Sequence, residues 1–464
     1  MSAGAVTLPP LATFRDPAGS LEIRPDGAYR FVRAPYDAEV QAFLDLPLAR
    51  DLVRSGRLIA SEILSRDADS QMLLMSHPLI LFSSYPWEWP PVLWRAAAEL
   101  TLELCRDLLK EGWILKDATP LNVLFQGAEP IFVDVLSIQR VKWDQPVWHA
   151  YGQFIRTFLL PMLANTKLGW PLQATLIRRD GYEPEDIFSA LPWYARMQQP
   201  ALSSVTLPLL LAKFTASVNV GEKAAFLKEP DLVKEILLNS LSRLEGQIRR
   251  IPSTSRSSHW SDYTDISSHY NDEDHSNKRG FVGRALTRSR SSRVLDVGCN
   301  TGTYSLLAAE LDAKVVAIDS DPQTVDRLSR TGAKNVLPLC VDLALPTPAI
   351  GWENREYSSF LSRCAGKFDT VMMLAVLHHL LLSSQIPLDH IATLCNRLTT
   401  DYLIMEWVPP TDAKYIEIIR GREAIYNHIT EAAYREAFAA YFMVIDELTL
   451  ANGRILFHLQ RRPA

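Results

Sequence analysis

The stretch RVLDVGCNTGT, residues Arg293–Thr303, decides the fold of the second half of the chain. The run Val294–Val297 is mostly apolar and β-prone, so it predicts a buried strand. Small residues from Gly298 to Gly302 then predict a sharp turn, where glycines let the backbone approach a ligand closely. The run Tyr304–Glu310 has a helical pattern. Strand, glycine turn and helix together predict the first unit of a nucleotide-binding α/β sheet.

An acidic residue follows at the spacing expected for a ribose contact. Asp319 lies 21 residues after Gly298, at the end of a second apolar run, Val315–Ile318. The carboxylate at the end of the second strand is where such sheets hold a ribose diol. The spacing G-x-N-x-G differs from the G-x-G-x-x-G that contacts a pyrophosphate. A ligand with a ribose and no diphosphate fits better, and S-adenosylmethionine is such a ligand. An ordinary βαβ unit with incidental glycines is the alternative.

The later segments follow in the order found in class I methyltransferases, which this half of the chain resembles. Strands are expected at 336–339, from 368 onward, and at 401–405. Two final strands flank Asn452-Gly453, a hairpin dipeptide, and a closing antiparallel hairpin separates this class from dehydrogenases. The resemblance implies an α/β fold with a Rossmann-like sheet, and S-adenosylmethionine as the cofactor.

The same resemblance supplies a set of cofactor-binding residues. Asp342 resembles the acidic residue that accepts a hydrogen bond from the adenine amino group, and Leu343 would pack on the ring. A helix before the first strand covers the cofactor in this class, which makes Tyr270 and Lys278 lid residues. The complete predicted set is Tyr270, Lys278, Asp296, Gly298, Asn300, Gly302, Asp319, Asp342, Leu343 and Ala375.

The predicted catalytic residues are His378, His379 and Glu406. The fourth strand of this class ends beside the methyl donor's sulfonium, and AVLHH stands there. A histidine could serve as general base, since imidazole titrates near neutral pH. The alternative is that one histidine packs against the cofactor and the other caps the following helix. Glu406 could orient the substrate, or could form an ion pair with an arginine such as Arg420 or Arg422.

A second informative stretch lies in the first half, WILKDATPLNVLFQGAEPIFVDVLS at Trp113–Ser137. Its Asp117, its Asn122 and an Asp134 in the expected strand Ile131–Val135 resemble the catalytic loop and metal-binding strand of the protein-kinase-like superfamily. By that resemblance Asp117 would position an acceptor hydroxyl, while Asn122 and Asp134 would hold magnesium. Asn122 and Asp134 are therefore the weak candidates for metal ligands in this chain.

The first half also departs from that superfamily. No lysine precedes Lys110, so the strand lysine that pairs with nucleotide phosphates is missing. Arg30 and Arg33 are possible substitutes, although arginine is a poor replacement for a compact ammonium. We therefore expect an α+β, kinase-like domain without phosphotransfer, used for substrate recognition. An active phosphotransferase and an unrelated α+β domain, in which Asp117 caps a turn and Asn122 satisfies backbone groups, are the alternatives.

Composition narrows the classes of partner and compartment. The chain has 464 residues, a net charge of -5 and 47% hydrophobic residues, which is ordinary for a globular protein and gives no reason to expect nucleic acid. The five cysteines show no C-x-x-C spacing, so a reducing compartment is expected. The start of the sequence is not a convincing signal peptide and no apolar run is long enough for a membrane span, which predicts a cytoplasmic protein.

The expected organisation is a kinase-like domain at 1–250, a linker and lid helix at 251–290, and a methyltransferase domain at 291–464. Nearly the whole chain resembles a family of bacterial methyltransferases that includes a rhizobial nodulation protein, because KDATPLNV, FVDVLS and EWVPP all occur in it. The predicted reaction is methyl transfer to an oxygen or nitrogen of a small-molecule, glycan, lipid or peptide acceptor. A bifunctional kinase and methyltransferase, and a non-catalytic scaffold that binds S-adenosylmethionine, are the alternatives.

Overall fold

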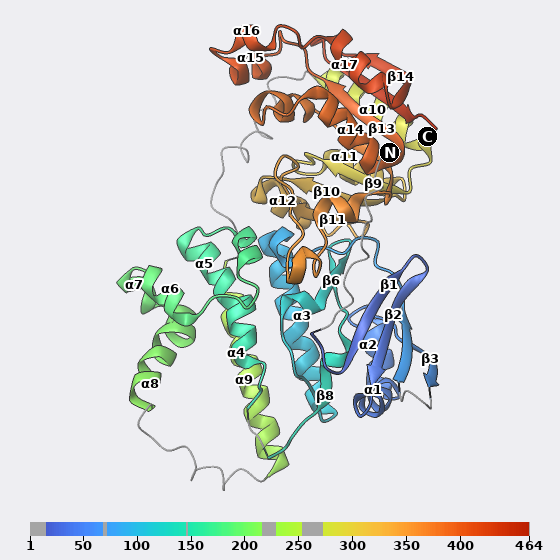
Figure 1. Cartoon of the computed structure of the whole chain (residues 1–464). Helices are drawn as coiled ribbons and strands as arrows, with labels where there is room; N and C mark the ends of the chain where they lie inside the picture. Colours follow the sequence, from blue (N-terminus) through green and yellow to red (C-terminus); the bar gives the residue numbers. More distant parts are fainter. Residues whose placement is uncertain (1–14, 68–71, 145–146, 216–228, 253–271, 464) are drawn as a thin grey trace. The chain divides into compact units, whose positions relative to one another are not determined.

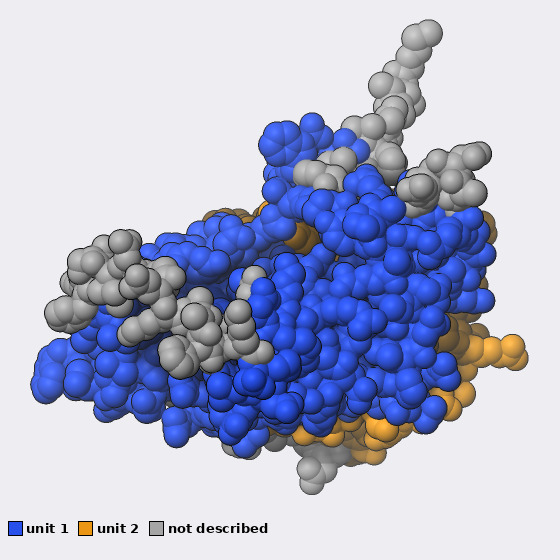
Figure 2. All heavy atoms as spheres, turned by 90° about the horizontal axis from the view of Figure 1, so that it is seen from below, with its two compact units in different colours: residues 1–256, 351–356 blue, residues 257–350, 357–464 orange. Residues whose placement is uncertain are grey.

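The computed structural model describes residues 15–67, 72–144, 147–215, 229–252 and 272–463. The chain divides into two compact units, which Figure 2 colours separately. Unit 1 comprises residues 1–256 and 351–356, and unit 2 comprises residues 257–350 and 357–464. Each unit has a β-sheet of its own. Among the described residues, no helix is both long enough and apolar enough to cross a membrane.

Unit 2 is built on a seven-stranded mixed sheet in the order β11-β10-β9-β12-β13-β15-β14 (Figure 1). The first five strands along the chain pair in parallel, and the last two add to the sheet as an antiparallel hairpin. This topology confirms the predicted strands, their α/β class and the closing hairpin. The strands are β9 (Arg293–Val297), β10 (Lys314–Asp319), β11 (Val336–Cys340), β12 (Phe368–Met373), β13 (Thr399–Trp407), β14 (Phe442–Thr449) and β15 (Ile455–Arg461).

Helices cover both faces of this sheet. Side chains alternate between faces along a strand, and Met372 packs with the α10 and α11 side of the core while Met373 contacts Cys395 of α14. The helices predicted before and directly after β9 are present as α10 and α11. The helices are α10 (Asp272–Ser289), α11 (Thr303–Glu310), α12 (Pro322–Ser329), α13 (Phe360–Cys364), α14 (Leu388–Leu398), α15 (Ala413–Ile419), α16 (Glu423–Tyr426) and α17 (Glu431–Ala439).

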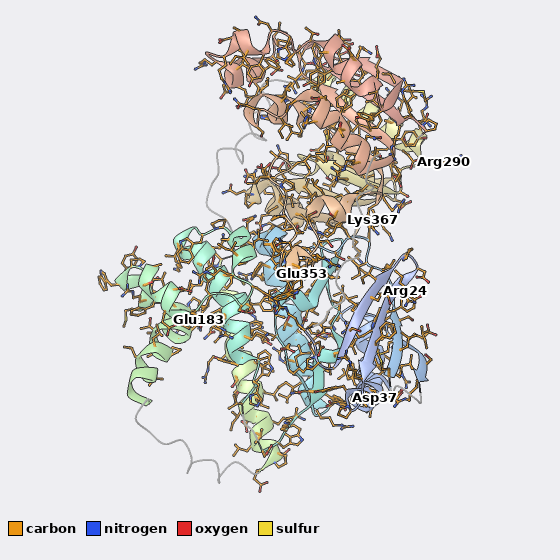
Figure 3. All side chains as sticks on the ribbon, viewed as in Figure 1. Arg24, Asp37, Glu183, Arg290, Glu353 and Lys367 are labelled. Carbon is orange, nitrogen blue, oxygen red and sulfur yellow. The ribbon has the colours of Figure 1, made fainter. Side chains whose placement is uncertain are left out.

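Unit 1 begins with a four-stranded antiparallel sheet in the order β1-β2-β4-β3. Its strands are β1 (Gly19–Arg24), β2 (Gly27–Arg33), β3 (Glu62–Asp67) and β4 (Met72–His77), and the pairing of β2 with β4 joins two hairpins. Two helices, α1 (Tyr36–Leu44) and α2 (Pro47–Arg54), connect β2 to β3. Asp37, labelled in Figure 3, lies in the first turn of α1. It pairs with Arg66 of β3 and so fastens the helix to the sheet.

The rest of unit 1 is mostly helical and surrounds two short strand pairs. The long helix α3 (Pro91–Lys110) packs against α9 (Pro230–Arg250). The strand pairs are β5 (Trp113–Leu115) with β8 (Ile138–Arg140), and β6 (Val123–Gln126) with β7 (Glu129–Phe132). The remaining helices are α4 (Tyr151–Phe154), α5 (Leu160–Leu168), α6 (Pro184–Ala190), α7 (Trp193–Arg196) and α8 (Leu207–Thr215).

One sequence expectation in unit 1 is wrong. Asp134 does not lie within a strand, because β7 ends at Phe132 and the Val133 N–H turns to the Asn122 carbonyl at 2.9 Å. Tertiary contacts here override a local β-prone pattern.

Candidate active site at the carboxyl edge of the unit 2 sheet

The turn after β9 requires glycine for two physical reasons. Gly298 has a φ of 70° and Gly302 a φ of 89°, a region that side chains disfavour. A Cβ added to Gly298 would lie 2.1 Å from Val376 Cγ2, and one added to Gly302 would lie 2.2 Å from Leu328 Cδ1. The N–H of Gly298 donates to the Ile318 carbonyl at 2.8 Å, which ties the turn to β10. Packing within the protein therefore fixes the shape of this turn.

Asp319 and Asn300 meet at the mouth of this turn. The Asp319 carboxylate accepts the backbone N–H groups of Asn300 and Asp321, each at 2.9 Å. Burial raises the pKa of this carboxyl. Asn300 itself has a φ of 50°, and its side-chain Oδ1 is buried with no hydrogen-bond partner among the described residues. An unsatisfied buried acceptor is costly, so a donor from a bound ligand fits this position.

Asp296 lies directly before the turn and is 3% exposed. The Ser305 hydroxyl donates to its Oδ2 at 2.5 Å, which joins β9 to α11. Burial, reinforced by the nearby Asp319 charge, raises the pKa of Asp296 to about 6. The hydrogen bond between Asp296 and Ser305 is therefore a structural contact between β9 and α11. Cofactor binding by Asp296 stays a prediction.

The register of the sheet brings the other predicted cofactor residues to the same edge. Asp319 pairs with Cys340 and Val297 pairs with Met373, so the residues after β9, β10, β11 and β12 are neighbours. Asp342 is exposed and accepts the Ala344 N–H at 2.8 Å, while Leu343 is buried. Ala375, two residues beyond β12, has a φ of 56°, and such strained backbone clusters at functional sites. The edge thus gathers Gly298, Asn300, Gly302, Asp319, Asp342, Leu343 and Ala375.

His378 and His379 follow β12, with ring centroids 4.1 Å apart. His378 is buried and His379 is half-buried. Burial lowers the pKa of His378 well below its usual value and that of His379 to about 4. Both rings are therefore neutral at pH 7. His378 precedes a π-helical turn, His379–Ser383, but makes no side-chain capping bond to it, so the capping alternative is wrong for this residue. Its Nδ1 is buried with no hydrogen-bond partner among the described residues.

Glu406 lies at the end of β13, fully buried within an ionic network. Its Oε2 accepts Lys278 Nζ of α10 at 2.5 Å, and its Oε1 accepts Arg454 Nη1 at 3.3 Å. Arg454 also pairs with Asp412 at 2.9 Å. The expected ion pair of Glu406 with an arginine is confirmed, but the arginine is Arg454 of the closing hairpin and not Arg420 or Arg422. Lys278 of α10 supplies a second cation.

Sequence reasoning missed Arg454 and Asp412. Arg454 follows the Asn452-Gly453 turn, and the register that pairs Trp407 with Ile455 places it beside the end of β13. The sequence predicts the hairpin, but only the register between β13 and β15 shows that Arg454 lies beside Glu406. Lys278, predicted as a lid residue, also lies 5.2 Å from the ring centroid of Tyr304. Tyr270 lies outside the described residues.

Of the predicted unit 1 residues Asp117, Asn122 and Asp134, the last forms an ion pair with an arginine. Arg30 of β2 donates from Nη1 to Asp134 Oδ1 at 2.8 Å. The other oxygen of Asp134 accepts the Ser137 hydroxyl, to which Asn122 Nδ2 donates at 3.0 Å. Asp117 has its pKa raised by burial. In the described part of the chain, no three His, Cys, Asp or Glu side chains gather as a metal site.

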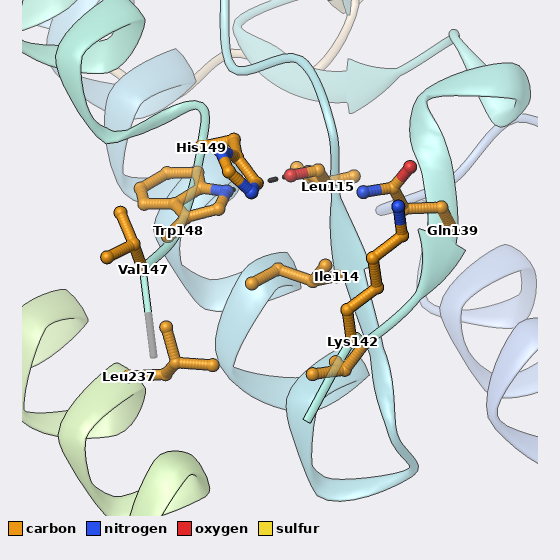
Figure 4. A pocket seen from close by; sticks show the side chains of 9 residues that line it. Ile114, Leu115, Gln139, Lys142, Val147, Trp148, His149 and Leu237 are labelled. Atoms are coloured by element: carbon orange, nitrogen blue, oxygen red, sulfur yellow. Dashed lines mark hydrogen bonds between the residues drawn. The ribbon is translucent and has the colours of Figure 1, made fainter. Parts of the chain in front are cut away.

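Unit 1 also contains a small pocket between β5, β8 and α9 (Figure 4). Trp148 closes one wall and donates from Nε1 to the Leu115 carbonyl at 2.7 Å. None of the predicted site residues lines it. The lining residues are Ile114, Leu115, Gln139, Val141, Lys142, Val147, Trp148, His149 and Leu237.

Residues 270–441, which contain this edge of the sheet, match the family model of a methyltransferase domain. This part of the chain is a methyltransferase domain. Its cofactor is S-adenosylmethionine. The match begins at the lid helix and ends before the last two strands, so it spans the glycine turn, Asp319, the histidine pair and Glu406.

The chain is also similar to named proteins. It is 29% identical over 472 residues to the nodulation protein NoeA of Rhizobium meliloti strain 1021, covering 97% of this chain and 95% of that protein. Among solved structures, it is similar to the N-methyltransferase NodS of Bradyrhizobium japonicum WM9, with 13% identity, a TM-score of 0.30, and 42% and 99% of the two chains covered. It is similar to the magnesium protoporphyrin IX methyltransferase of Synechocystis PCC 6803, with 19% identity, a TM-score of 0.30, and 41% and 84% covered.

Proposed function

We propose that the chain transfers a methyl group from S-adenosylmethionine to an oxygen or nitrogen nucleophile of a small-molecule, glycan, lipid or peptide acceptor. The observation that carries this proposal is the turn after β9, where Asn300 donates its backbone N–H to the Asp319 carboxylate and its own Oδ1 has no partner among the described residues. A ligand with a cationic amino group and a ribose diol satisfies both groups. The backbone on either side is already fixed by Gly298 and Gly302.

The proposed roles follow from the placement of the residues. Asn300 accepts from the amino group of the cofactor, Asp319 accepts from the ribose, and Asp342 accepts from the adenine amino group, with Leu343 against the ring. Lys278 and Tyr270 belong to the covering segment. The bound sulfonium supplies an already activated methyl group, so the protein contributes mainly by holding the acceptor in line with it.

Calorimetric titration with S-adenosylhomocysteine tests this proposal. The unaltered chain is expected to bind it, and Asp319→Asn is expected to weaken binding at least about tenfold, because a hydrogen bond to a charged group is lost. Asp389→Asn, which changes an exposed carboxyl in the first turn of α14, is the matched control and leaves affinity unchanged. Absence of binding by the unaltered chain would overturn the proposal.

For the first half of the chain we propose a kinase-like fold that recognises the acceptor and does not transfer phosphate. The order of a four-stranded sheet, the long α3 and the Asp117 loop supports the fold. The Arg30–Asp134 pair supports the loss of phosphotransfer, since a guanidinium engages the carboxylate that magnesium would need. We retain residues 1–250 for recognition, 251–290 as linker and lid, and 291–464 for methyl transfer.

This arrangement disfavours the two alternatives. A bifunctional kinase would need Asp134 to exchange Arg30 for a metal ion. A non-catalytic scaffold would not need neutral histidines beside the cofactor edge. A cytoplasmic location is supported by the five cysteines, which are all buried and free.

A further inference from the structure

The pocket of unit 1 in Figure 4 is formed by side chains that are held in place by their own contacts. Ile114 of β5 pairs with Gln139 of β8 in the antiparallel strand pair, and Leu237 of α9 is 2% exposed. Trp148 donates from Nε1 to the Leu115 carbonyl at 2.7 Å, so its ring stays in the wall and does not turn into the space. The pocket is therefore part of the folded unit and needs no rearrangement to form, as is usual for ligand sites.

Most of the lining of this pocket is apolar, and its size is small. Five aliphatic side chains and the Trp148 indole line it. The cavity has a volume of about 50 Å³. A buried water needs about 10–15 Å³, so the cavity takes a group of a few heavy atoms. A branched aliphatic group of about three or four carbons suits both this size and this lining.

The polar side chains of the pocket favour an anion. They are Gln139, Lys142 and His149, and none of the described residues that line the pocket has a carboxylate. Lys142 is exposed, and its side chain makes no ion pair or hydrogen bond within the described residues. An ammonium has three N–H donors and no acceptor, so Lys142 attracts an anion and repels a cation.

The polar and apolar groups line different sides of the pocket. Figure 4 shows Gln139 and Lys142 on the β8 side, and Val147 and Trp148 on the opposite side. The Gln139 amide also carries N–H donors. A ligand that fits therefore has an apolar group toward Trp148 and a negatively charged acceptor toward Lys142.

The described acidic residues of the surrounding elements do not line the pocket. Glu39 of α1 accepts the Arg140 backbone N–H at 2.7 Å. Asp144 and Glu235 are exposed. An exposed carboxylate outside the pocket is screened by water and salt, whereas Lys142 lines the pocket itself.

We propose that this pocket binds a short, branched aliphatic carboxylate, with the hydrocarbon group against Trp148 and Leu237. The carboxylate accepts hydrogen bonds from the Lys142 ammonium and the Gln139 amide. The site lies within unit 1 and does not depend on the proposed methyl transfer. Because β5 ends two residues before Asp117, the ligand contacts the strand that leads into the Asp117 loop.

Three probes of the same shape test this proposal on the full-length chain at constant ionic strength. Isobutyrate is negative, isobutyramide is neutral and isobutyramidinium is positive. The nuclear magnetic resonance signal of the Trp148 indole N–H, assigned with Trp148→Phe, reports binding. A ligand of this size binds in about the millimolar range. Isobutyrate is expected to shift the signal saturably, isobutyramide more weakly, and isobutyramidinium not at all.

Two outcomes of this comparison would overturn the proposal. One is no response of the Trp148 signal to isobutyrate. The other is a response to isobutyramide or isobutyramidinium that equals or exceeds the response to isobutyrate.

A variant tests the role of the ammonium. Lys142→Met keeps the hydrocarbon stem and is expected to weaken isobutyrate about fivefold, the upper end for an exposed ion pair, while isobutyramide binds as before. Lys110→Met is the matched control, because Lys110 lies outside the pocket and pairs with Asp107 at 2.8 Å. Equal isobutyrate affinity in Lys142→Met and the unaltered chain would contradict the role of Lys142.

The hydrocarbon part of the ligand has its own test. Acetate lacks the two methyl groups of isobutyrate and is expected to bind about tenfold more weakly, because less apolar surface is buried. Equal affinities for acetate and isobutyrate would show that the hydrocarbon group does not enter the pocket, and so would contradict the proposed ligand class.

Discussion

Gly298 shows how a single residue fixes the cofactor turn. Its φ of 70° and the nearness of Val376 are independent constraints. Gly298→Ala is expected to destabilise unit 2 by more than about 2 kcal/mol, because left-handed backbone costs about 1–2 kcal/mol and the methyl group overlaps Val376. Urea unfolding measures this loss.

Gly332 provides the matched control for that prediction. It has a φ of 65°, but a Cβ there meets nothing within 4 Å. Gly332→Ala should therefore show the backbone cost alone, about 1–2 kcal/mol. Equal losses in the two variants would show that the contact with Val376 does not matter.

His379 makes stability sensitive to acid. Its pKa is lowered to about 4 by burial, so the unfolded chain binds a proton between pH 6.5 and 4 that the folded chain does not. Stability is therefore present above pH 6.5 and is lost as the pH falls toward 4. His379→Gln should unfold with a shallower pH dependence in this window, measured by urea unfolding at a series of pH values.

Asp296 contributes to the pH dependence of stability with the opposite sign to His379 in the same range of pH. Its pKa of about 6 is raised by burial, so the folded chain binds the extra proton and acid favours folding. Asp296→Asn should remove this opposing contribution and make the acid sensitivity steeper. The same pH dependence in the unaltered chain and both variants would contradict these two assignments.

At the scale of elements, the buried ionic network joins α10, β13, the β14–β15 hairpin and α15 through Lys278, Glu406, Arg454 and Asp412. Glu406→Gln removes the charge of the carboxylate that Lys278 and Arg454 share, while Asp412 still pairs with Arg454. Breaking a buried pair in this way costs about 3–5 kcal/mol, and urea unfolding should show such a loss.

Arg279, the residue after Lys278 in α10, supplies the control. Arg279 pairs with Glu310, and both side chains are largely exposed. Arg279→Ala should change stability by less than about 1 kcal/mol. If Glu406→Gln costs no more than Arg279→Ala, the network does not fasten the lid helix to the sheet.

At the scale of the whole molecule, the chain has two units with separate sheets. Scanning calorimetry is expected to show two unfolding transitions, of which S-adenosylhomocysteine raises one. A ligand at 100 times its dissociation constant stabilises its unit by about 2.7 kcal/mol. Magnesium with ATP should raise neither transition, because Arg30 engages Asp134.

Two variants show which unfolding transition belongs to which unit. Gly298→Ala should lower the transition that S-adenosylhomocysteine raises, and Arg30→Ala should lower the other. A single cooperative transition would contradict independent units, and a rise with magnesium and ATP would contradict the loss of nucleotide binding in unit 1.

The sequence by itself determined the strands of unit 2, their α/β class, the closing hairpin and the glycine turn. These depend on hydrophobic periodicity and on the backbone freedom of glycine, which are local properties. Only the tertiary structure decided what the charged residues do. Glu406 meets Lys278 across 128 residues, and Arg30 meets Asp134 across 104. Ion pairs depend on which elements become neighbours, and register between distant strands sets that, so no spacing in the chain could reveal them.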